Sequence, residues 1–231
     1  LLEELNRSIS VPKHRGKPIR RKFSYLSDPK NIDVEKSDLK RDEIQMELAT
    51  TTIGDYALMG TFNISNSSKD NGTYSAKLLY KKRALDARMD SRFLLERQIL
   101  AALKGKSRCL PTLTNVYQDD KVIMLNYDDV FVCDLALAIA NDAIEEDNKT
   151  YYAACLCDAT FALHDLGVMS RFINPGSVFI TSKGIPKITG LRYAKKLDGQ
   201  KSYTICGDPL YFAPELVKQQ GYDYGVDLWA L

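Results

Sequence analysis

The sequence has no long apolar segment, because no run approaches the roughly 20 residues that a transmembrane helix needs. Its first residues, LLEELNRSIS, lack the order of basic then apolar residues that is typical of a signal peptide. It also lacks an excess of one charge, since 32 Lys and Arg residues stand against 30 Asp and Glu residues. These absences predict an intracellular, cytoplasmic protein without a membrane span, and they give no reason to expect nucleic acid as a partner.

Patterns that bind metal are missing as well. The five cysteines form no CxxC pair. Cys155 and Cys157 stand in an apolar helical pattern, which favours buried thiols over metal ligands. His164 lies in the apolar stretch FALHDLG, where a histidine is more typical of the core than of a catalytic site. The sequence therefore predicts no metal site.

What is present is a chain of 231 residues, 45% of them hydrophobic, which is enough for one sizeable core or two lobes. It starts without Met and ends at DLWAL, inside an apolar pattern, so we expect it to be part of a longer protein. Residues 1–52 are polar and charged and predict a linker that is partly helical near each end. The basic run KHRGKPIRRKFS within it ends at Ser24, which is either solvated linker or a phosphorylation site of the basophilic type.

The segment from residue 53 to 126 has a strand-like pattern. Residues 55–64 and 72–82 predict a hairpin around the polar turn 65–71. Leucines and isoleucines at helical spacing predict an amphipathic helix over 86–103. Two short strands are expected near 113–117 and 121–125.

After Asn126 the pattern becomes helical. We expect helices over 130–140 and 150–167, the second of them closed by Gly167. The short runs SVFI and PKIT predict a second hairpin around Gly184. Strands that come first and helices that come later predict an α+β protein of two lobes.

Four motifs point to one family. Ala76-Lys77 stands in a predicted strand, and Glu96 follows 19 residues later in a predicted helix. The other three motifs are GVMSRFINPGSVFI, KITGLRYAKKL and TICGDPLYFAPE. With these motifs, residues from about 53 to 231 resemble protein kinases of the AGC group, above all the cyclic-nucleotide-dependent Ser/Thr kinases. They are also similar to the kinase-like region of plant proteins that join a phosphatase 2C domain, cyclic-nucleotide-binding modules and a kinase-like domain.

The resemblance implies an α+β, two-lobed protein-kinase-like fold that is truncated within the C-lobe. Its N-lobe would span 53–126 and its partial C-lobe 127–231. It also implies that Lys77 holds the phosphates of ATP and that Glu96 keeps Lys77 oriented. An ordinary exposed charge pair is the alternative for these two residues.

The same resemblance shows that the catalytic residues are degraded. Phe172 stands where the family has its catalytic Asp, and Asn174 replaces the Lys that steadies the γ-phosphate. Ser177 and Gly190 replace the Asn and the Asp that hold Mg²⁺. The stretch MGTFNIS keeps Gly60 but not the glycine repeat that covers the phosphates. The resemblance therefore implies that no cofactor is required and that ATP could bind without Mg²⁺. Phe179 is expected to narrow the slot under the adenine.

The regulatory positions are better preserved. Thr204 matches the phosphorylated Thr of the activation segment, and Arg171 and Lys195 match the basic residues that bind its phosphate. Alternatively, Arg171 and Lys195 serve in packing or at the surface, and Thr204 is unmodified. Three more residues match structural positions of the family: His164, Glu215 and Asp227.

Three functions are compatible with this pattern. The favoured one is a pseudokinase that regulates or docks a protein partner, or upstream cyclic-nucleotide-binding or phosphatase domains of the same chain. The second is a weakly active Ser/Thr kinase with non-standard catalytic residues. The third is a relic domain that only spaces its neighbours.

Overall fold

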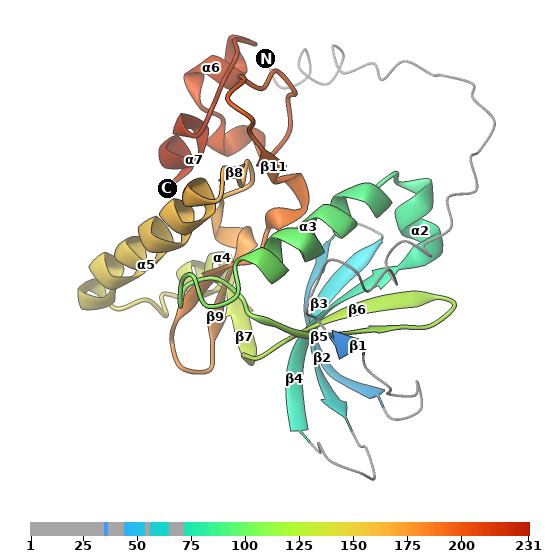
Figure 1. Cartoon of the computed structure of the whole chain (residues 1–231). Coiled ribbons are helices and arrows are strands. Elements are labelled where there is room, and N and C mark those ends of the chain that lie inside the picture. Colours follow the sequence, from blue (N-terminus) through green and yellow to red (C-terminus); the bar gives the residue numbers. More distant parts are fainter. Residues whose placement is uncertain (1–34, 37–43, 54–55, 65–71) are drawn as a thin grey trace, which may run out of the picture.

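The computed structural model describes residues 35–36, 44–53, 56–64 and 72–231 (Figure 1). It has a mixed α+β architecture, as the sequence predicts. Figure 1 shows a sheet on one side and the helices α5, α6 and α7 on the other, with α3 along the boundary. The sheet has the strand order β1-β5-β6-β4-β3-β2. Its strands are β1 (Glu35–Lys36), β2 (Ile44–Ile53), β3 (Ala57–Ile64), β4 (Gly72–Tyr80), β5 (Leu113–Gln118) and β6 (Val122–Tyr127).

The predicted hairpin is confirmed, because β3 and β4 pair in antiparallel fashion. Its turn, residues 65–71, lies outside the described residues. Both strands carry apolar residues that are fully buried, including Met59 and Leu79. The two short strands expected near 113–117 and 121–125 are also present, as β5 and β6. The register of β4 against β6 places Lys77 opposite Leu125, in the middle of the sheet.

The sheet extends further toward the N-terminus than expected. Strand β2, Ile44–Ile53, pairs with β3 along its length, so the helix predicted near the end of the 1–52 linker is wrong there. Apolar and polar residues alternate in IQMEL and are followed by three threonines, which is a strand pattern that the surrounding charges conceal. Ser24 and the basic run before it lie outside the described residues.

The predicted helix over 86–103 is present with a later start. A short helix, α2 (Lys81–Asp86), precedes the long helix α3 (Asp90–Ala102). Arg88 separates them, because its φ of 56° is left-handed and interrupts the helical path. Phe93, Ile99 and Leu100 on α3 are buried in the main hydrophobic core, which fixes the helix against the sheet.

The second lobe is mostly helical. Its helices are α4 (Leu135–Ala140), α5 (Glu146–Asp165), α6 (Pro214–Val217) and α7 (Gly225–Ala230), with 3₁₀ turns η4 (Pro175–Ser177), η5 (Leu191–Tyr193) and η6 (Pro209–Tyr211). Its strands are β7 (Phe131–Asp134), β8 (Val168–Met169), β9 (Val178–Thr181), β10 (Pro186–Ile188) and β11 (Lys195–Lys196).

One helix of this lobe is shorter than predicted. The first residues of the expected helix over 130–140 form strand β7, which pairs with β9. The helix α4 begins only after Asp134, whose carboxylate accepts a hydrogen bond from the Leu137 N–H at 2.8 Å. Valine and phenylalanine favour the strand in VFVC, and the aspartate cap sets the start of the helix.

The helix over 150–167 and the hairpin around Gly184 are confirmed. Helix α5 ends before Gly167, whose φ of 73° closes the helix in the left-handed region. Cys155 on α5 is buried, as expected, whereas Cys157 is only partly so. Strands β9 and β10 pair across Gly184, which also has a positive φ. Among the helices of the described ranges, none has the length and apolarity needed to cross a membrane.

Candidate functional site

Lys77 and Glu96 form a buried ion pair between the two main elements of the first lobe. Lys77 comes from β4 and Glu96 from α3, and the Lys77 Nζ lies 2.7 and 2.6 Å from the two carboxylate oxygens. Their side chains are 3% and 0% exposed. They are therefore not an exposed surface pair. Burial lowers the pKa of the Lys77 ammonium, and the contact with Glu96 opposes that shift.

Phe172, at the position that the resemblance matches to the catalytic carboxylate, forms a tilted pair with another aromatic ring. The ring of Phe172 lies 5.1 Å from the ring of Tyr193. The guanidinium of Arg192 lies 4.0 Å from the centre of the Phe172 ring and 5.1 Å from that of Tyr193. A second guanidinium, that of Arg92 on α3, lies 4.9 Å from the centre of the Tyr193 ring. These cation–π contacts join α3 of the first lobe to the loops of the second.

Gly190 lies against two of the other three degraded positions, Phe172 and Ser177. A Cβ atom on Gly190 would lie 2.6 Å from the Cβ of Ser177 and 2.9 Å from Cδ1 of Phe172. These separations are far below a normal van der Waals contact, so position 190 has no room for a side chain. The space that an Asp would need is filled by the residues at the other two positions.

The residues present do not fit an Mg²⁺ site. Gly190 offers no side-chain ligand. The hydroxyl of Ser177 donates to the Asn174 carbonyl oxygen at 2.9 Å and accepts from the Asn174 N–H at 3.1 Å, so it serves the turn η4. In the part of the chain that the structure describes, no group of three His, Cys, Asp or Glu side chains could hold a metal ion. Mg²⁺ requires oxygen ligands, above all carboxylates, and this set does not supply them.

Phe179, the residue expected under the adenine, belongs to a cluster of aromatic rings. Phe179 is buried on β9, and its ring lies 5.7 Å from that of Phe131 on β7. Phe131 in turn lies 5.6 Å from the ring of Tyr127. The N–H of Phe131 donates to the hydroxyl of Ser75 at 2.7 Å, which holds β7 close to β4. Sequence reasoning singled out Phe179 but missed its contact with Phe131.

The stretch around Gly60 is not a loop. Gly60 lies inside strand β3, paired with Ala49 on one side and Ala76 on the other. The interpretation of MGTFNIS as the remnant of a phosphate-covering loop is therefore wrong. The connection between β2 and β3 contains residues 54–55, which are outside the described residues.

Arg171 is connected to the activation segment through a tyrosine. Its Nε donates to the Tyr193 carbonyl oxygen at 2.7 Å, and its Nη1 donates to the Tyr222 hydroxyl at 3.1 Å. That hydroxyl donates to the Thr204 carbonyl oxygen at 2.6 Å. Thr204 itself is exposed. The structure thus brings Arg171 to the segment of Thr204 through Tyr222, which the sequence interpretation did not single out.

Lys195 reaches the same segment two residues earlier. Its Nζ donates to the hydroxyl of Ser202 at 3.1 Å. Ser202 is buried, and its backbone exchanges two hydrogen bonds with Tyr222, at 2.8 and 2.9 Å. The unphosphorylated segment is therefore already held by hydrogen bonds from Lys195 and Tyr222 to uncharged oxygen atoms.

Removing the Tyr222 hydroxyl is expected to weaken this part of the fold. Tyr222→Phe would remove the hydroxyl that both the Arg171 guanidinium and the Thr204 carbonyl contact. Tyr222 is only 2% exposed. We expect the free energy of unfolding to fall by about 1–3 kcal/mol in urea denaturation. Tyr203→Phe is the matched control, because Tyr203 is 71% exposed and should change little. Equal stability of the two variants would contradict the assigned network.

Of the three residues that match structural positions of the family, His164 and Asp227 lie together, whereas Glu215 is partly exposed elsewhere. His164 Nε2 and Asp227 Oδ2 are 2.9 Å apart, between α5 and α7. Asp227 also accepts from the backbone N–H groups of Ser170 and Arg171, at 2.8 and 2.7 Å. Glu215 is partly exposed on α6 and forms no ion pair with any residue of the described ranges.

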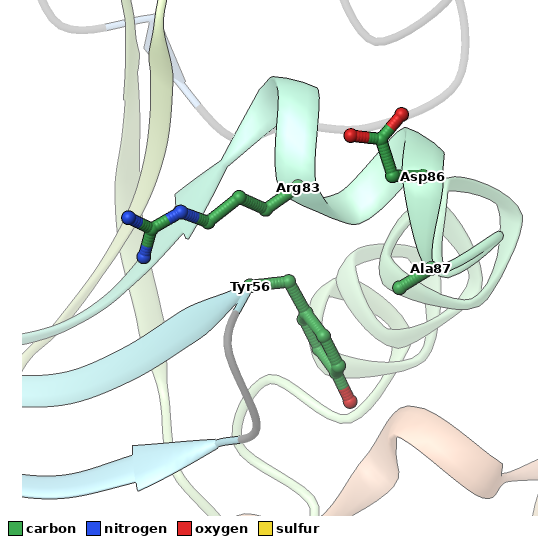
Figure 2. Close-up of a pocket in the computed structure, with 4 residues that line it drawn as sticks. All are labelled: Tyr56, Arg83, Asp86 and Ala87. Atoms are coloured by element: carbon green, nitrogen blue, oxygen red, sulfur yellow. The ribbon is translucent and has the colours of Figure 1, made fainter.

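Three pockets lie in or beside this region. The outer pocket is open, measures about 680 Å³ and is lined by Tyr56, Arg83, Asp86 and Ala87. Figure 2 shows the charged ends of Arg83 and Asp86 on α2 pointing in different directions, with the ring of Tyr56 between α2 and α3. None of the predicted site residues lines it. The inner pocket measures only about 10 Å³, and Lys77, Glu96 and Arg192 are among its lining residues. The third measures about 20 Å³, with Arg171, Phe172 and Asp227 among its lining residues.

The fold and the buried pair define a class of protein. A strand lysine paired with a helix glutamate, next to a helical lobe with an ordered activation segment, is the arrangement of protein kinases. Residues 54–231 match the model of the protein kinase domain family. Since this is most of the chain, the chain belongs to that family.

The chain is distantly related to cGMP-dependent protein kinases. It is 25% identical to human cGMP-dependent protein kinase 2 over 233 residues, which cover 99% of this chain and 28% of the human protein. It is 24% identical over 222 residues to the Drosophila melanogaster cGMP-dependent protein kinase, isozyme 2 forms cD5/T2, covering 90% of this chain and 23% of that protein. The chain therefore spans about a quarter of the length of these relatives.

Proposed function

We propose that this protein kinase domain is a pseudokinase, a kinase-like module that regulates or docks other proteins and does not transfer phosphate. The observation that carries the proposal is the contact of position 190 with positions 172 and 177. Since a Cβ at Gly190 would meet Ser177 at 2.6 Å, the metal ligand is absent and its place is occupied. Without metal, the charge of a triphosphate is poorly neutralised.

Two further features support the same conclusion. Phe172 has no proton-accepting group for a substrate hydroxyl, and its ring is engaged by Arg192 and Tyr193. Phe179, which is expected under the adenine, packs against Phe131 with ring centroids 5.7 Å apart, and this pair would narrow the slot for a nucleoside. Each of these changes affects a different part of phosphoryl transfer.

A weakly active kinase is the second candidate. The Lys77–Glu96 ion pair favours it, because active kinases use this pair to hold ATP. The relatives are also kinases by name. Nevertheless, the pair is buried under Arg192 and Phe93, so it also serves as a structural link between sheet and helix.

The partners we propose are proteins. The relatives are about four times longer than this chain, and their names concern cGMP. We therefore place the module in cyclic-nucleotide-type signalling inside the cell, in contact with other domains of its own chain or with a separate protein. Thr204 is its proposed regulatory site, because it is exposed and Arg171 and Lys195 reach its segment.

Thermal denaturation with ATP tests the proposed function. A ligand at 100 times its dissociation constant adds about 2.7 kcal/mol to stability, which such a measurement detects easily. We expect no Mg²⁺-dependent rise in the melting temperature, with human cGMP-dependent protein kinase 2 as the positive control. A Mg²⁺-dependent rise, together with incorporation of labelled phosphate into protein, would establish the second candidate instead.

A further inference from the structure

The connection from α3 to β5 carries a serine among basic residues. Ser107 is partly exposed, and the basic side chains of Lys104, Lys106 and Arg108 around it are exposed. Gly105, with a left-handed φ of 75°, allows the chain to turn here at the surface. A serine flanked by lysine and arginine is the pattern that basophilic protein kinases select. The sequence and the exposure of this turn therefore make Ser107 a candidate for modification.

Ser107 also attaches this turn to the second lobe (Figure 1). Its hydroxyl donates to the Asp158 carboxylate on α5 at 2.5 Å and accepts from the Cys109 N–H at 3.0 Å. The Cys109 carbonyl oxygen accepts in turn from the Ile188 N–H of β10 at 3.2 Å. The serine hydroxyl thus joins the segment after α3, the helix that carries Glu96, directly to α5 and supports its contact with β10.

A phosphate on Ser107 would turn this attraction into repulsion. The proton that Asp158 accepts would be lost, and a group with a charge of about −1.5 to −2 would stand against a carboxylate. The basic residues of the turn do not hold the phosphate there, because they belong to the same segment and move with it. Lys187, whose charge acts on Cys109, is already paired with Asp129. The modified turn is therefore expected to leave α5.

Two buried thiols beneath the turn report its position. Cys109, in the connection, and Cys155, on α5, are 7% and 6% exposed and belong to the main hydrophobic core. Burial raises the pKa of the Cys109 thiol to about 12, and its contact with the Cys155 thiol adds to the shift. A thiol with such a pKa reacts slowly, because the thiolate is the nucleophile. Departure of the turn would expose Cys109 to water and make it reactive.

We propose that Ser107 is a phosphorylation site at which a separate basophilic protein kinase releases the turn after α3 from the second lobe. In this reaction the Ser107 oxygen forms a bond to the γ-phosphorus of MgATP, the bond from that phosphorus to its bridging oxygen breaks, and ADP leaves. The hydroxyl proton passes to the catalytic base of the modifying kinase. The site is independent of the proposed function, because it uses none of the degraded catalytic positions.

The full chain with phosphoserine introduced genetically at position 107 tests the release. We expect iodoacetamide to label Cys109 at least about tenfold faster than in the unmodified chain, as measured by peptide mass spectrometry. Phosphoserine at position 182, on the exposed turn between β9 and β10, adds the same charge and is the matched control that should leave this rate unchanged. Ser107→Ala, which removes the hydrogen bond without adding charge, should accelerate labelling by less than about threefold.

Removal of the opposing carboxylate separates repulsion from general damage. In the phosphoserine protein, Asp158→Asn should bring Cys109 labelling back to within about threefold of the unmodified rate, because the amide can donate to the phosphate. Equal labelling with and without the phosphate at position 107 would overturn the release. Fast labelling, or a loss of structure seen by circular dichroism, that Asp158→Asn does not reverse would overturn it as well.

The modification itself is tested on protein isolated from the cells that produce it. Peptide mass spectrometry is expected to find phosphate on Ser107, and the same peptide from Ser107→Ala protein should carry none at this position. Absence of phosphate from Ser107 would overturn the site. Each of these results leaves the pseudokinase proposal intact, since that proposal is tested by Mg²⁺-dependent binding of ATP.

Discussion

Replacing Glu96 with Ala is expected to lower the free energy of unfolding by about 3–5 kcal/mol, which is a large part of the stability of an ordinary domain. The change leaves the Lys77 ammonium in a site where its side chain is only 3% exposed. A charge that is buried in such a site without a partner loses its solvation by water and has no ion pair to offset that loss. Urea denaturation followed by circular dichroism measures the effect.

A double variant separates the charge from the packing. In Lys77→Met with Glu96→Leu, both charges are replaced by apolar side chains of similar size, and we expect most of the lost stability to return. Exposed Lys149 and Glu146 form the matched surface pair, so Glu146→Ala should change stability by less than about 1 kcal/mol. If Glu96→Ala were no worse than Glu146→Ala, the Lys77–Glu96 pair would not be the buried link between β4 and α3.

The strand and the helix that carry this pair are predicted because their signals are local and periodic, whereas the pairing itself is implied by the family resemblance. Lys77 stands in an alternating strand, and Glu96 stands in a helix with apolar residues at regular spacing, so the elements and the interval can be recognised without coordinates. The same holds for α5, with its Gly167 stop, and for the β9–β10 hairpin. Strand β2 escaped prediction because the charged residues around it conceal the alternation in IQMEL, and its pairing with β3 is not visible in the sequence.

The contacts inside the candidate site could not be predicted, for a different reason. The sequence shows that Phe172, Ser177 and Gly190 each depart from the family, and it does not show that Gly190 touches the other two. Likewise, nothing in GYDYG indicates that the Tyr222 hydroxyl joins Arg171 to Thr204. Such contacts depend on where three or four loops meet, and loop conformation carries little sequence signal.

The contacts change how the degraded residues are interpreted. Separate losses of function would leave gaps, because each missing side chain would vacate space near its neighbours. Here Phe172 and Ser177 fill the space beside Gly190, and Arg192 covers Phe172. The altered residues therefore form one packed unit, which Tyr193 connects to Arg92 on α3. Reversal of one member is then expected to disrupt the unit and not to restore catalysis.

Gly190→Asp, the reversal that would restore the metal ligand, is accordingly expected to destabilise the protein by about 3–5 kcal/mol and to confer no Mg²⁺-dependent ATP binding. The backbone is not the obstacle, since the φ of Gly190 is −80°, which any residue adopts. The cost arises because the new Cβ would meet Ser177 at 2.6 Å and Phe172 at 2.9 Å, and because a carboxylate would then be buried without a ligand. Urea denaturation and thermal shift with Mg²⁺ and ATP measure the two effects.

Three companion variants identify the cause. Gly190→Ala adds the Cβ without charge and should account for about 1–3 kcal/mol of the loss. Ser182→Asp places the same charge on the exposed turn between β9 and β10 and should be nearly neutral. Combining Gly190→Asp with Phe172→Ala removes one of the two colliding side chains, so it should cost less than the sum of the two single changes. A stable Gly190→Asp protein that binds ATP with Mg²⁺ would mean that the packed unit rearranges at little cost and that a metal site lies one substitution away. Strict additivity of Gly190→Asp and Phe172→Ala would mean that the two positions do not interact.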